Sequence, residues 1–325
     1  MKKRLFSGIQ PSGEIHIGNY LGALKNWVKL MPEYEAIYCV VDYHALTVPQ
    51  DPAILRERIL TTATMLLAMG LDPEKCSLFV QSHVPEHTEL SWLLGTVIHI
   101  GHLERMTQFK DKCKQHPEDI SVGLFTYPVL QTADIALYKA EAVPVGEDQL
   151  QHLELAREVV RRFNSRFGDI FPEPQAKVTS AARIMGLDGK AKMSKSMNNT
   201  IGLSDTPAEI EGKLKPAITD VNRKRRTDPG NPDICNIYSL HKHFSTPEII
   251  SEVDRECRVA GIGCIDCKMK LAKGMIAELS PIRERFSELS ARPQDVKAAL
   301  EKGAEHCRAI AKATIEEVRI AVGVR

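Results

Sequence analysis

The chain has 325 residues, of which 43% are hydrophobic and 26% charged, the composition of an ordinary globular protein. A formal net charge of +1 excludes a strong overall positive field, so a nucleic-acid partner would have to be held by local basic patches. No apolar stretch approaches membrane-spanning length, and the basic N-terminus lacks the apolar segment of a signal peptide. These properties predict a cytoplasmic protein with one large domain and a smaller one.

The first half of the chain alternates strands with helices. Strands are predicted at residues 3–9, 36–41, 76–81 and 142–145, and helical periodicity begins at 17 and at 53 and follows the last strand. This alternation predicts an α/β fold with a doubly wound, Rossmann-like parallel sheet. Ligands bind such sheets at the carboxyl ends of the strands, where Gln10 and Asp42 would lie.

After Lys192 the alternation stops and helices dominate. They are expected at about residues 207–214, 247–259, 268–288 and 293–321. We therefore expect a Rossmann-like domain over 1–189, a junction over 190–205 and an all-helical domain over 206–325, whose last helix could pack back on the first domain.

A glycine-rich turn follows the first strand and ends in His16-Ile17-Gly18-Asn19. A tight loop that enters a helix presents unpaired backbone N–H groups to an anion. Gly18 would let a nucleobase approach the backbone, and His16 and Asn19 can donate hydrogen bonds to phosphate or ribose oxygens. An ordinary turn with a surface histidine explains the same residues about equally well.

Two lysines stand on a glycine-flanked loop, in the string Lys192-Met193-Ser194-Lys195-Ser196. Lysines are compact charges with flexible reach, and they suit a leaving diphosphate on which charge develops in the transition state. The alternative is a solvated basic loop. The string matches a known catalytic loop letter for letter, which favours catalysis.

The two motifs together resemble the class I aminoacyl-tRNA synthetases. Segments 6–13, 104–110, 133–135 and 145–149 further resemble the tryptophanyl branch, and the resemblance covers most of residues 4–200. His99-Ile100-Gly101-His102 spells the family's better-known string, but it follows a helix-like run, so we interpret it as coincidental and place the nucleotide turn at 16–19. Asn19 replaces the family's second histidine, as this branch commonly shows.

The resemblance implies an enzyme that activates L-tryptophan with ATP and Mg²⁺ to an adenylate, transfers it to tRNA(Trp) and works as a homodimer. Catalytic roles are implied for Gln10, Lys112, Lys192 and Lys195. Contacts to ATP are implied for Gln10, Pro11, Ser12, His16, Gly18, Asn19, Gly146, Glu147, Asp148, Ile184, Lys192, Met193, Ser194, Lys195 and Ser196.

Asp134 is the implied specificity residue, because a buried carboxylate can accept a hydrogen bond from the indole N–H of tryptophan. Phenylalanine would leave that acceptor unpaired. A carboxylate on a helix surface is the alternative. Gln131 stands where the tryptophanyl branch usually has methionine, which weakens the assignment of the side-chain pocket. The side chains expected around the amino acid, besides Asp134, are Phe6, Gly8, His44, Tyr127, Gln131, Val143, Val145 and Gln149.

Four of the eight cysteines cluster in the second half of the chain, as Cys235, Cys257, Cys264 and Cys267. Four thiolates can hold a 4Fe-4S cluster or a Zn²⁺ ion, and free thiols are a third interpretation. Structural zinc sites usually show two short cysteine pairs, whereas this chain has one. A minority of tryptophanyl enzymes carry a cluster on a similar arrangement whose first gap is one residue longer, so we expect 4Fe-4S.

The basic run Asn222–Arg226 precedes Cys235, the first of these cysteines, and is either a solvated loop or a phosphate contact near the tRNA anticodon. Three alternatives to the whole assignment remain. They are a tyrosyl enzyme, a nucleotidyltransferase of the same fold that uses no tRNA, and a non-catalytic RNA-binding or sensor protein.

Overall fold

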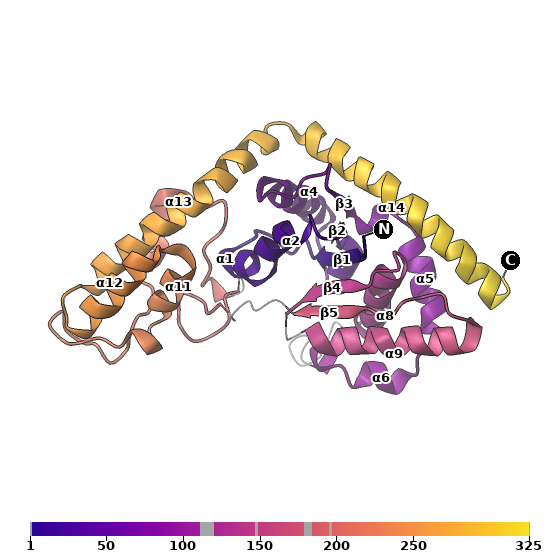
Figure 1. Ribbon diagram of the computed structural model, residues 1–325, viewed down its shortest axis with the longest axis horizontal. Helices are drawn as coiled ribbons and strands as arrows, with labels where there is room; N and C mark the ends of the chain where they lie inside the picture. The colour runs from indigo at the N-terminus through magenta and orange to yellow at the C-terminus, as the bar shows by residue number, and fades with distance from the viewer. Residues whose placement is uncertain (1, 111–119, 147–148, 179–183, 195–196, 325) are drawn as a thin grey trace. The chain divides into compact units, whose positions relative to one another are not determined.

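The computed structural model describes residues 2–110, 120–146, 149–178, 184–194 and 197–324 (Figure 1). The chain divides into two compact units. Unit 1 comprises residues 1–13, 26–180 and 289–325, and unit 2 comprises residues 14–25 and 181–288. Within the described residues, no helix is long and apolar enough to cross a membrane.

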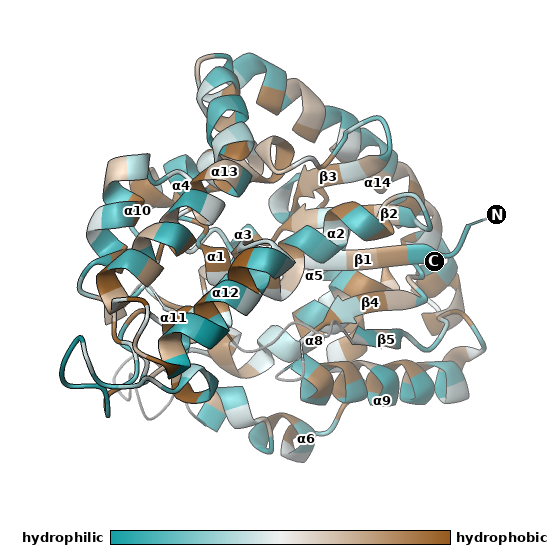
Figure 2. Cartoon of the chain, turned by 60° about the vertical axis from the view of Figure 1, so that its left-hand side comes forward, coloured by the Kyte–Doolittle hydropathy of each residue, from teal (hydrophilic) through white to brown (hydrophobic). Residues whose placement is uncertain are grey.

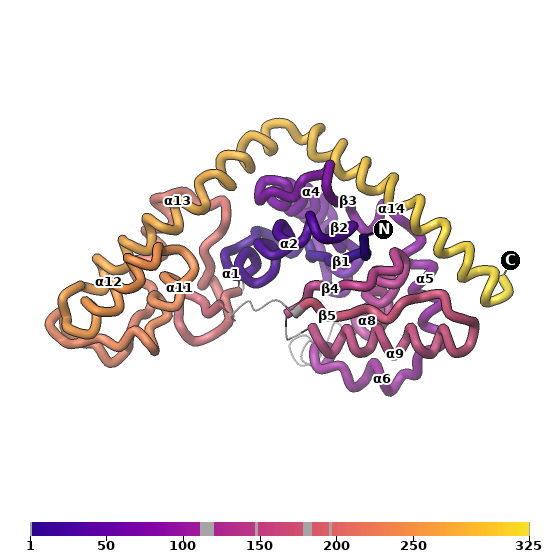
Figure 3. Tube along the Cα trace, viewed as in Figure 1, coloured from indigo at the N-terminus to yellow at the C-terminus, as the bar shows by residue number. Residues whose placement is uncertain are grey.

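Unit 1 is built on a parallel five-stranded sheet, which confirms the predicted fold class. Its spatial order is β3-β2-β1-β4-β5 (Figure 3). The chain therefore adds β2 and β3 on one side of β1 and then β4 and β5 on the other side. This order places the switch point of the sheet between β1 and β4, where ligands of such folds bind. The strands are β1 Arg4–Ile9, β2 Glu35–Val40, β3 Cys76–Val80, β4 Ala142–Val145 and β5 Gln175–Val178.

Strands β1, β2 and β3 are apolar on both faces, as expected where helices cover a parallel sheet. Leu5, Ile37 and Leu78 are fully buried, and β1, β2 and β3 are largely brown in the hydropathy view (Figure 2). β5 was not predicted, because its sequence Gln-Ala-Lys-Val is short and half polar.

Helices of unit 1 flank this sheet. In α9, His152, Leu155, Val159 and Phe163 are all buried, which confirms the face predicted from their spacing. The string His99–His102 lies at the start of α6, so it is on a helix as its context indicated. The helices that lie wholly in this unit are α3 Asp42–Ala45, α4 Pro52–Ala68, α5 Glu86–Gly95, α6 Ile100–Glu104, α8 Val122–Ala136, α9 Leu150–Phe167 and α14 Pro293–Val322, with the 3-10 turn η2 Gln81–His83.

The last helix, α14, packs on the edge strand β3. A Cβ on Gly303 would lie 2.1 Å from the Leu78 carbonyl oxygen, so glycine is what allows the helix to approach the strand backbone. Residues 289–325 therefore belong with the sheet in unit 1, as the expectation of a helix packing back on the first domain allowed.

Unit 2 is mainly helical. Its Thr206 caps α10 by accepting from the Glu209 N–H, while the Glu209 carboxylate accepts from the Thr206 N–H. The helix predicted from residue 17 is interrupted by a π-helical turn, and a helix at 236–244 was not predicted. The helical elements are α1 Ile17–Asn19, η1 Tyr20–Leu24, α10 Pro207–Leu214, η5 Pro232–Ile234, α11 Asn236–Phe244, α12 Pro247–Arg258 and α13 Cys264–Ser290, with α2 Lys25–Leu30 leading into unit 1.

Candidate active site

A cavity of about 330 Å³ lies in unit 1 between β1, β4 and α8. All nine side chains expected around the amino acid line it, namely Phe6, Gly8, His44, Tyr127, Gln131, Asp134, Val143, Val145 and Gln149. Gln10, which was expected to contact ATP, also lines it. Five further lining residues were not predicted, and they are Ser7, Val41, Gln108, Ile135 and Pro144.

The regular geometry of three elements brings these side chains together. Phe6 and Gly8 alternate along β1, and Val143 and Val145 alternate along β4, so each pair points to one face of its strand. Tyr127, Gln131 and Asp134 are spaced by four and three residues along α8 and therefore share one helix face. The cavity thus forms where that face meets the two strands at the switch point.

Asp134 is 1% exposed and its carboxylate is held by three side chains. Its Oδ1 accepts from Gln81 Nε2 and from His87 Nδ1, each at 2.7 Å, and its Oδ2 accepts from His44 Nε2 at 2.8 Å. Burial raises the pKa of this carboxyl, but the hydrogen bonds from His44 and His87 outweigh burial and hold its pKa well below the usual range. The cavity therefore contains a buried, ionised carboxylate, and the surface-carboxylate interpretation was wrong.

Sequence reasoning missed Gln81 and His87. Gln81 immediately follows β3, and polar residues at the carboxyl ends of parallel strands are the signal that would have identified it. His87 lies in the first turn of α5, and nothing in its local sequence distinguishes it from a surface histidine.

Tyr127 and Gln149 lie at another part of the same cavity. The Tyr127 hydroxyl lies 2.7 Å from His152 Nε2, and burial raises the pKa of Tyr127 to about 12, so it remains a neutral hydroxyl. His152, from α9, was predicted only as a helix-face residue.

The glycine-rich turn that follows β1 is divided between the units. In unit 1, Ser12 N–H donates to the Gln10 carbonyl at 2.8 Å, and Pro11 is buried. In unit 2, His16 caps α1, because its Nδ1 accepts from Gly18 N–H at 3.1 Å while Asn19 Oδ1 accepts from His16 N–H at 3.2 Å. Those two side-chain atoms therefore organise the turn.

Within unit 2 the structure joins this turn to the Lys192–Ser194 segment. A Cβ on Gly18 would lie 2.9 Å from the His16 ring and 3.3 Å from Met193 Cβ, so close packing of the chain itself already favours glycine there. Ile17 N–H donates to the Ile201 carbonyl at 2.9 Å, just beyond the lysine loop. Two motifs that are 175 residues apart are thus neighbours.

The lysine loop itself folds back on Ile184 and is held by Asn199. Met193 N–H donates to the Ile184 carbonyl at 3.0 Å, and Lys192 pairs with Met185 in an antiparallel bridge. Asn199 is 3% exposed, accepts from Ser194 N–H at 2.8 Å and donates to Asp188 at 3.1 Å. Asn199 was missed because an asparagine beside a loop carries no distinctive sequence signal.

Five of the predicted residues lie outside the described part of the chain. They are Lys112, Glu147, Asp148, Lys195 and Ser196. Their neighbour Gly146 is described, and its carbonyl accepts from Gln149 N–H at 3.0 Å.

The four clustered cysteines lie in unit 2 and are all free thiols. Cys267 interacts electrostatically with Cys235, Cys257 and Cys264, so the four sulfurs are near one another. Burial raises the pKa of Cys235 and Cys257, and it raises that of Cys267 to about 12. As the side chains stand, no group of three or more His, Cys, Asp or Glu residues in the described chain is placed to hold a metal ion.

Arg223 braces this four-cysteine corner. Its Nη2 donates to the Arg226 and Ile262 carbonyls at 2.8 and 2.9 Å, and its Nη1 approaches Cys264 Sγ at 3.7 Å. Arg226 in turn donates to the Ala260 carbonyl at 2.7 Å. Two of the four basic residues in the run at 222–226 therefore tie it to the cysteine-bearing segment.

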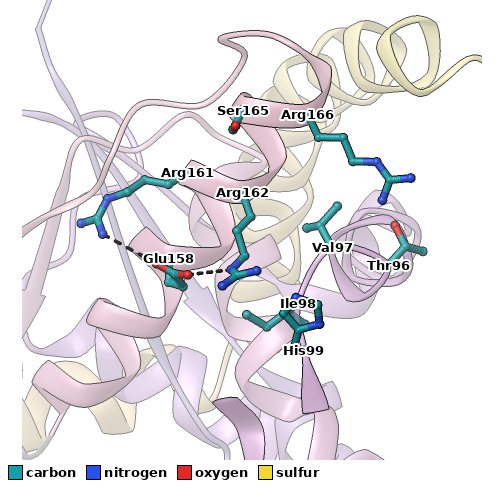
Figure 4. A pocket seen from close by; sticks show the side chains of 9 residues that line it. All are labelled: Thr96, Val97, Ile98, His99, Glu158, Arg161, Arg162, Ser165 and Arg166. Atoms are coloured by element: carbon teal, nitrogen blue, oxygen red, sulfur yellow. Dashed lines mark hydrogen bonds and ion pairs between the residues drawn. The ribbon is translucent and has the colours of Figure 1, made fainter. Parts of the chain in front are cut away.

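A second hollow, of about 490 Å³, lies in unit 1 between α9 and the segment joining α5 to α6 (Figure 4). Arg161, Arg162 and Arg166 project from α9 along it. Glu158 pairs with Arg162 at 2.6 Å and with Arg161 at 3.8 Å, which offsets much of their charge. None of the predicted site residues that the structure describes lines this hollow.

Comparison with known proteins agrees with the cavity and the motifs. The family described as tRNA synthetases class I (W and Y) matches residues 1–280. A tryptophan–tRNA ligase of Deinococcus radiodurans is 52% identical over 325 residues, covering 98% of each chain. The chain belongs to the class I tryptophanyl-tRNA synthetases.

Solved structures of tryptophanyl-tRNA synthetases place the fold in the same family. The enzyme of Campylobacter jejuni, solved with ADP and tryptophan, superposes with a TM-score of 0.90 at 36% identity, covering 98% of this chain and 99% of that one. A tyrosyl-tRNA synthetase of Archaeoglobus fulgidus has a TM-score of 0.69 at 23% identity, which shows a shared fold only. The tryptophanyl assignment is therefore favoured over the tyrosyl alternative.

Proposed function

We propose that this synthetase activates L-tryptophan with ATP to tryptophanyl-adenylate and transfers the tryptophanyl group to tRNA(Trp), releasing diphosphate and AMP. The observation that carries this proposal is the cavity at the switch point of the sheet, which gathers eight expected residues together with the buried, ionised carboxylate of Asp134. Asp134 accepts the indole N–H, and Tyr127 and Gln149 bind the amino-acid head. The site residues are thus assigned to tryptophan by their chemistry.

The reaction needs no nucleophile from the protein, because the tryptophan carboxylate attacks the α-phosphate of MgATP and diphosphate leaves. Catalysis is then orientation of the two substrates and stabilisation of the charge that develops on the leaving group. The residues proposed to contact ATP are Gln10, Pro11, Ser12, His16, Gly18, Asn19, Gly146, Glu147, Asp148, Ile184 and residues 192–196, and Lys112 is proposed to approach its phosphates.

Lys192 and Lys195 are proposed to neutralise the leaving diphosphate. Replacing Lys195 with alanine is expected to slow adenylate formation strongly while tryptophan affinity changes little, because the lysine acts on charge found mainly in the transition state. Pre-steady-state adenylate formation and tryptophan binding by calorimetry measure the two quantities. Equal losses in both would contradict this role.

The function itself is tested by pyrophosphate exchange across the twenty amino acids. Exchange stimulated by tryptophan and not by tyrosine is expected, followed by aminoacylation of tRNA(Trp). Exchange without aminoacylation would instead favour a nucleotidyltransferase, and stimulation by tyrosine would favour the tyrosyl alternative.

We further propose that Cys235, Cys257, Cys264 and Cys267 hold a 4Fe-4S cluster. Four cysteines that interact electrostatically provide the ligand number such a cluster uses. The side chains must move together to ligate it, because no three ligating atoms are gathered as they stand. When bound, the cluster would supply a rigid cross-link for this part of unit 2, and a Zn²⁺ ion is the alternative occupant.

The cluster proposal is tested on protein purified without oxygen. About four irons per chain and a broad absorption near 400 nm are expected, and both are lost in Cys257→Ser but kept in Cys76→Ser, a buried cysteine of the sheet. Stoichiometric zinc would support the alternative occupant. A colourless preparation without metal would overturn both.

The helical unit is proposed to bind the tRNA near its anticodon. Arg223 and Arg226 are engaged with backbone carbonyls, whereas the Lys224 and Arg225 side chains are exposed. Phosphate contact is therefore assigned to Lys224 and Arg225. Arg225→Ala is expected to weaken tRNA binding and reduce its salt dependence; unchanged binding at moderate salt would favour a solvated loop.

A cytoplasmic homodimer is proposed as the working form. The support from the structure is a set of large apolar side chains exposed on unit 1, among them Trp92, Ile100 and Val122. The cysteines of the described chain are free thiols, which fits a reducing compartment. Analytical ultracentrifugation of wild type and Trp92→Glu tests the dimer, which the charge should weaken.

A further inference from the structure

A chain of buried polar side chains continues behind Asp134, away from the cavity. His87 donates from Nδ1 to Asp134 Oδ1, and its Nε2 lies 2.7 Å from the Tyr138 hydroxyl. His87 and Tyr138 are both 0% exposed, and neither lines the cavity. Their hydrogen bonds therefore reach the cavity through Asp134, while the Tyr138 ring also stacks on Phe6 of the cavity wall, a contact that Tyr138→Phe would keep.

The ionised carboxylate of Asp134 determines which atoms donate and which accept in this series of hydrogen bonds. An ionised carboxylate only accepts, so His87 Nδ1 and Gln81 Nε2 must donate to it. A neutral imidazole that donates from Nδ1 accepts at Nε2, so the Tyr138 hydroxyl donates to His87. The orientation of Gln81 is fixed separately, because its Oε1 accepts from Tyr43 N–H at 3.1 Å.

These contacts use most of the accepting capacity of the carboxylate. Each carboxylate oxygen offers about two lone-pair positions. In Asp134, Oδ1 accepts two hydrogen bonds and Oδ2 accepts one, from His44. One position on Oδ2 is left for a ligand, and Asp134 lines the cavity.

We infer that His87 and Tyr138 are positioning residues for tryptophan recognition, which saturate Oδ1 and aim the remaining acceptor of Oδ2 at the indole N–H. This inference rests on the proposed role of Asp134 in reading that group. Rotation of the carboxylate would break two short hydrogen bonds at Oδ1, so the acceptor cannot turn to suit a ligand without a donor. Selectivity for an N–H then depends on side chains that never touch the substrate.

The inference is tested with tryptophan and its benzothiophene analogue, in which sulfur replaces the indole N–H. Wild type is expected to prefer tryptophan by about 100-fold in kcat/KM for pyrophosphate exchange, because the analogue leaves Oδ2 unpaired. Tyr138→Phe is expected to reduce this preference about 3- to 10-fold. The change should appear as a higher KM for tryptophan with kcat nearly unchanged, because the contact is made equally in ground and transition states.

A matched control separates positioning from general stability. Tyr38 is also 0% exposed, and its hydroxyl donates to the Trp27 carbonyl at 2.8 Å. This hydrogen bond is not part of the Asp134 network. Tyr38→Phe is expected to leave the preference unchanged. His87→Asn, whose amide can replace the Nδ1 donor, should keep more of the preference than His87→Leu. Equal loss for both substrates in Tyr138→Phe, or no loss in His87→Leu, would overturn the inference.

Asp134→Ala distinguishes failure of the inference from failure of the proposed function. If it abolishes the preference while Tyr138→Phe and His87→Leu retain it, Asp134 reads the indole without help from His87 and Tyr138. If Asp134→Ala retains the preference, the role of Asp134 is wrong and the inference falls with it. Asp134→Leu, which has a similar side-chain shape but no acceptor, gives the same comparison if the alanine variant does not fold.

Discussion

The Asp134 network of unit 1 and the four-cysteine corner of unit 2 both bury groups that can ionise, yet the protein treats them in opposite ways. Three side chains donate to Asp134 and hold its pKa low, so its charge is present before any ligand binds. At the cysteines, burial and the neighbouring sulfurs raise the pKa of Cys267 to about 12. The first site is completed by the fold, whereas the thiols of the second would ionise only on binding the proposed metal, whose positive charge would deprotonate them.

The largest effect is expected for the stability of Asp134→Ala. Removing the carboxylate leaves the donors of His44, His87 and Gln81 buried without their acceptor, which should cost about 3–5 kcal/mol. Chemical denaturation measures this loss. Glu173→Ala, which breaks an exposed pair with Arg161, is the control and should scarcely change the unfolding midpoint. Similar midpoints for the two variants would show that the Asp134 network does not stabilise unit 1.

Acid should remove part of that stabilisation. The pKa of Asp134 is lowered by folding, so its contribution is fully present above the unfolded pKa of about 4 and is lost as the pH falls toward the folded pKa. The stability difference between wild type and Asp134→Asn should therefore be constant from about pH 7 to 5 and shrink below about pH 4. A difference that grows on acidification would show that the carboxyl is protonated in the folded protein.

In unit 2, Arg223→Ala is expected to cost about 2 kcal/mol, because the exposed Arg226 carbonyl and the partly buried Ile262 carbonyl both lose a charged donor. Thermal unfolding of metal-free protein measures this. The exposed Arg225→Ala is the matched control and should have little effect. If both variants behave alike, Arg223 does not brace the cysteine corner.

Gly230→Ala should have the smallest effect on stability, about 1 kcal/mol, yet a clear one on metal content. Its Cβ would lie 2.6 Å from Cys257 Sγ and displace that thiol. Iron bound per chain after reconstitution should fall relative to wild type. Gly212→Ala in α10, where a Cβ meets nothing within 4 Å, is the control and should bind the full complement. Full iron content in both would show that Cys257 is not a required ligand.

Several elements could be predicted because their local sequence indicates whether they are buried and where they begin. The strand at 36–41 is a continuous apolar run, and the helix at 207–214 carries proline at its first position and a capping threonine. β5 and the helix at 236–244 were not predicted, because their local sequence lacks such signals. β5 is too short and too polar to signal burial, and α11 follows irregular chain that hides its start.

The candidate site divides in the same way. Motifs and residue chemistry predicted the nine side chains that line one cavity, and the expectation for Asp134 included its burial. Gln81 was missed although it lies at the carboxyl end of β3, whereas His87 and Tyr138 could not be chosen, because hydrogen bonds across 47 and 51 residues leave no local pattern. The structure also gives a packing reason for glycine at position 18, because a Cβ there would lie 3.3 Å from Met193 Cβ of the lysine loop.

By itself the sequence determined the type of sheet, because periodicity is a local property of the chain, and its motifs carried the resemblance that implied the reaction class and the residues proposed for tryptophan. Only the tertiary structure decided that the two motifs of unit 2 are neighbours, that α14 rests on β3 and that Asp134 keeps its charge when buried. Charge in a buried site depends on which donors arrive from distant segments, and folding alone supplies those donors.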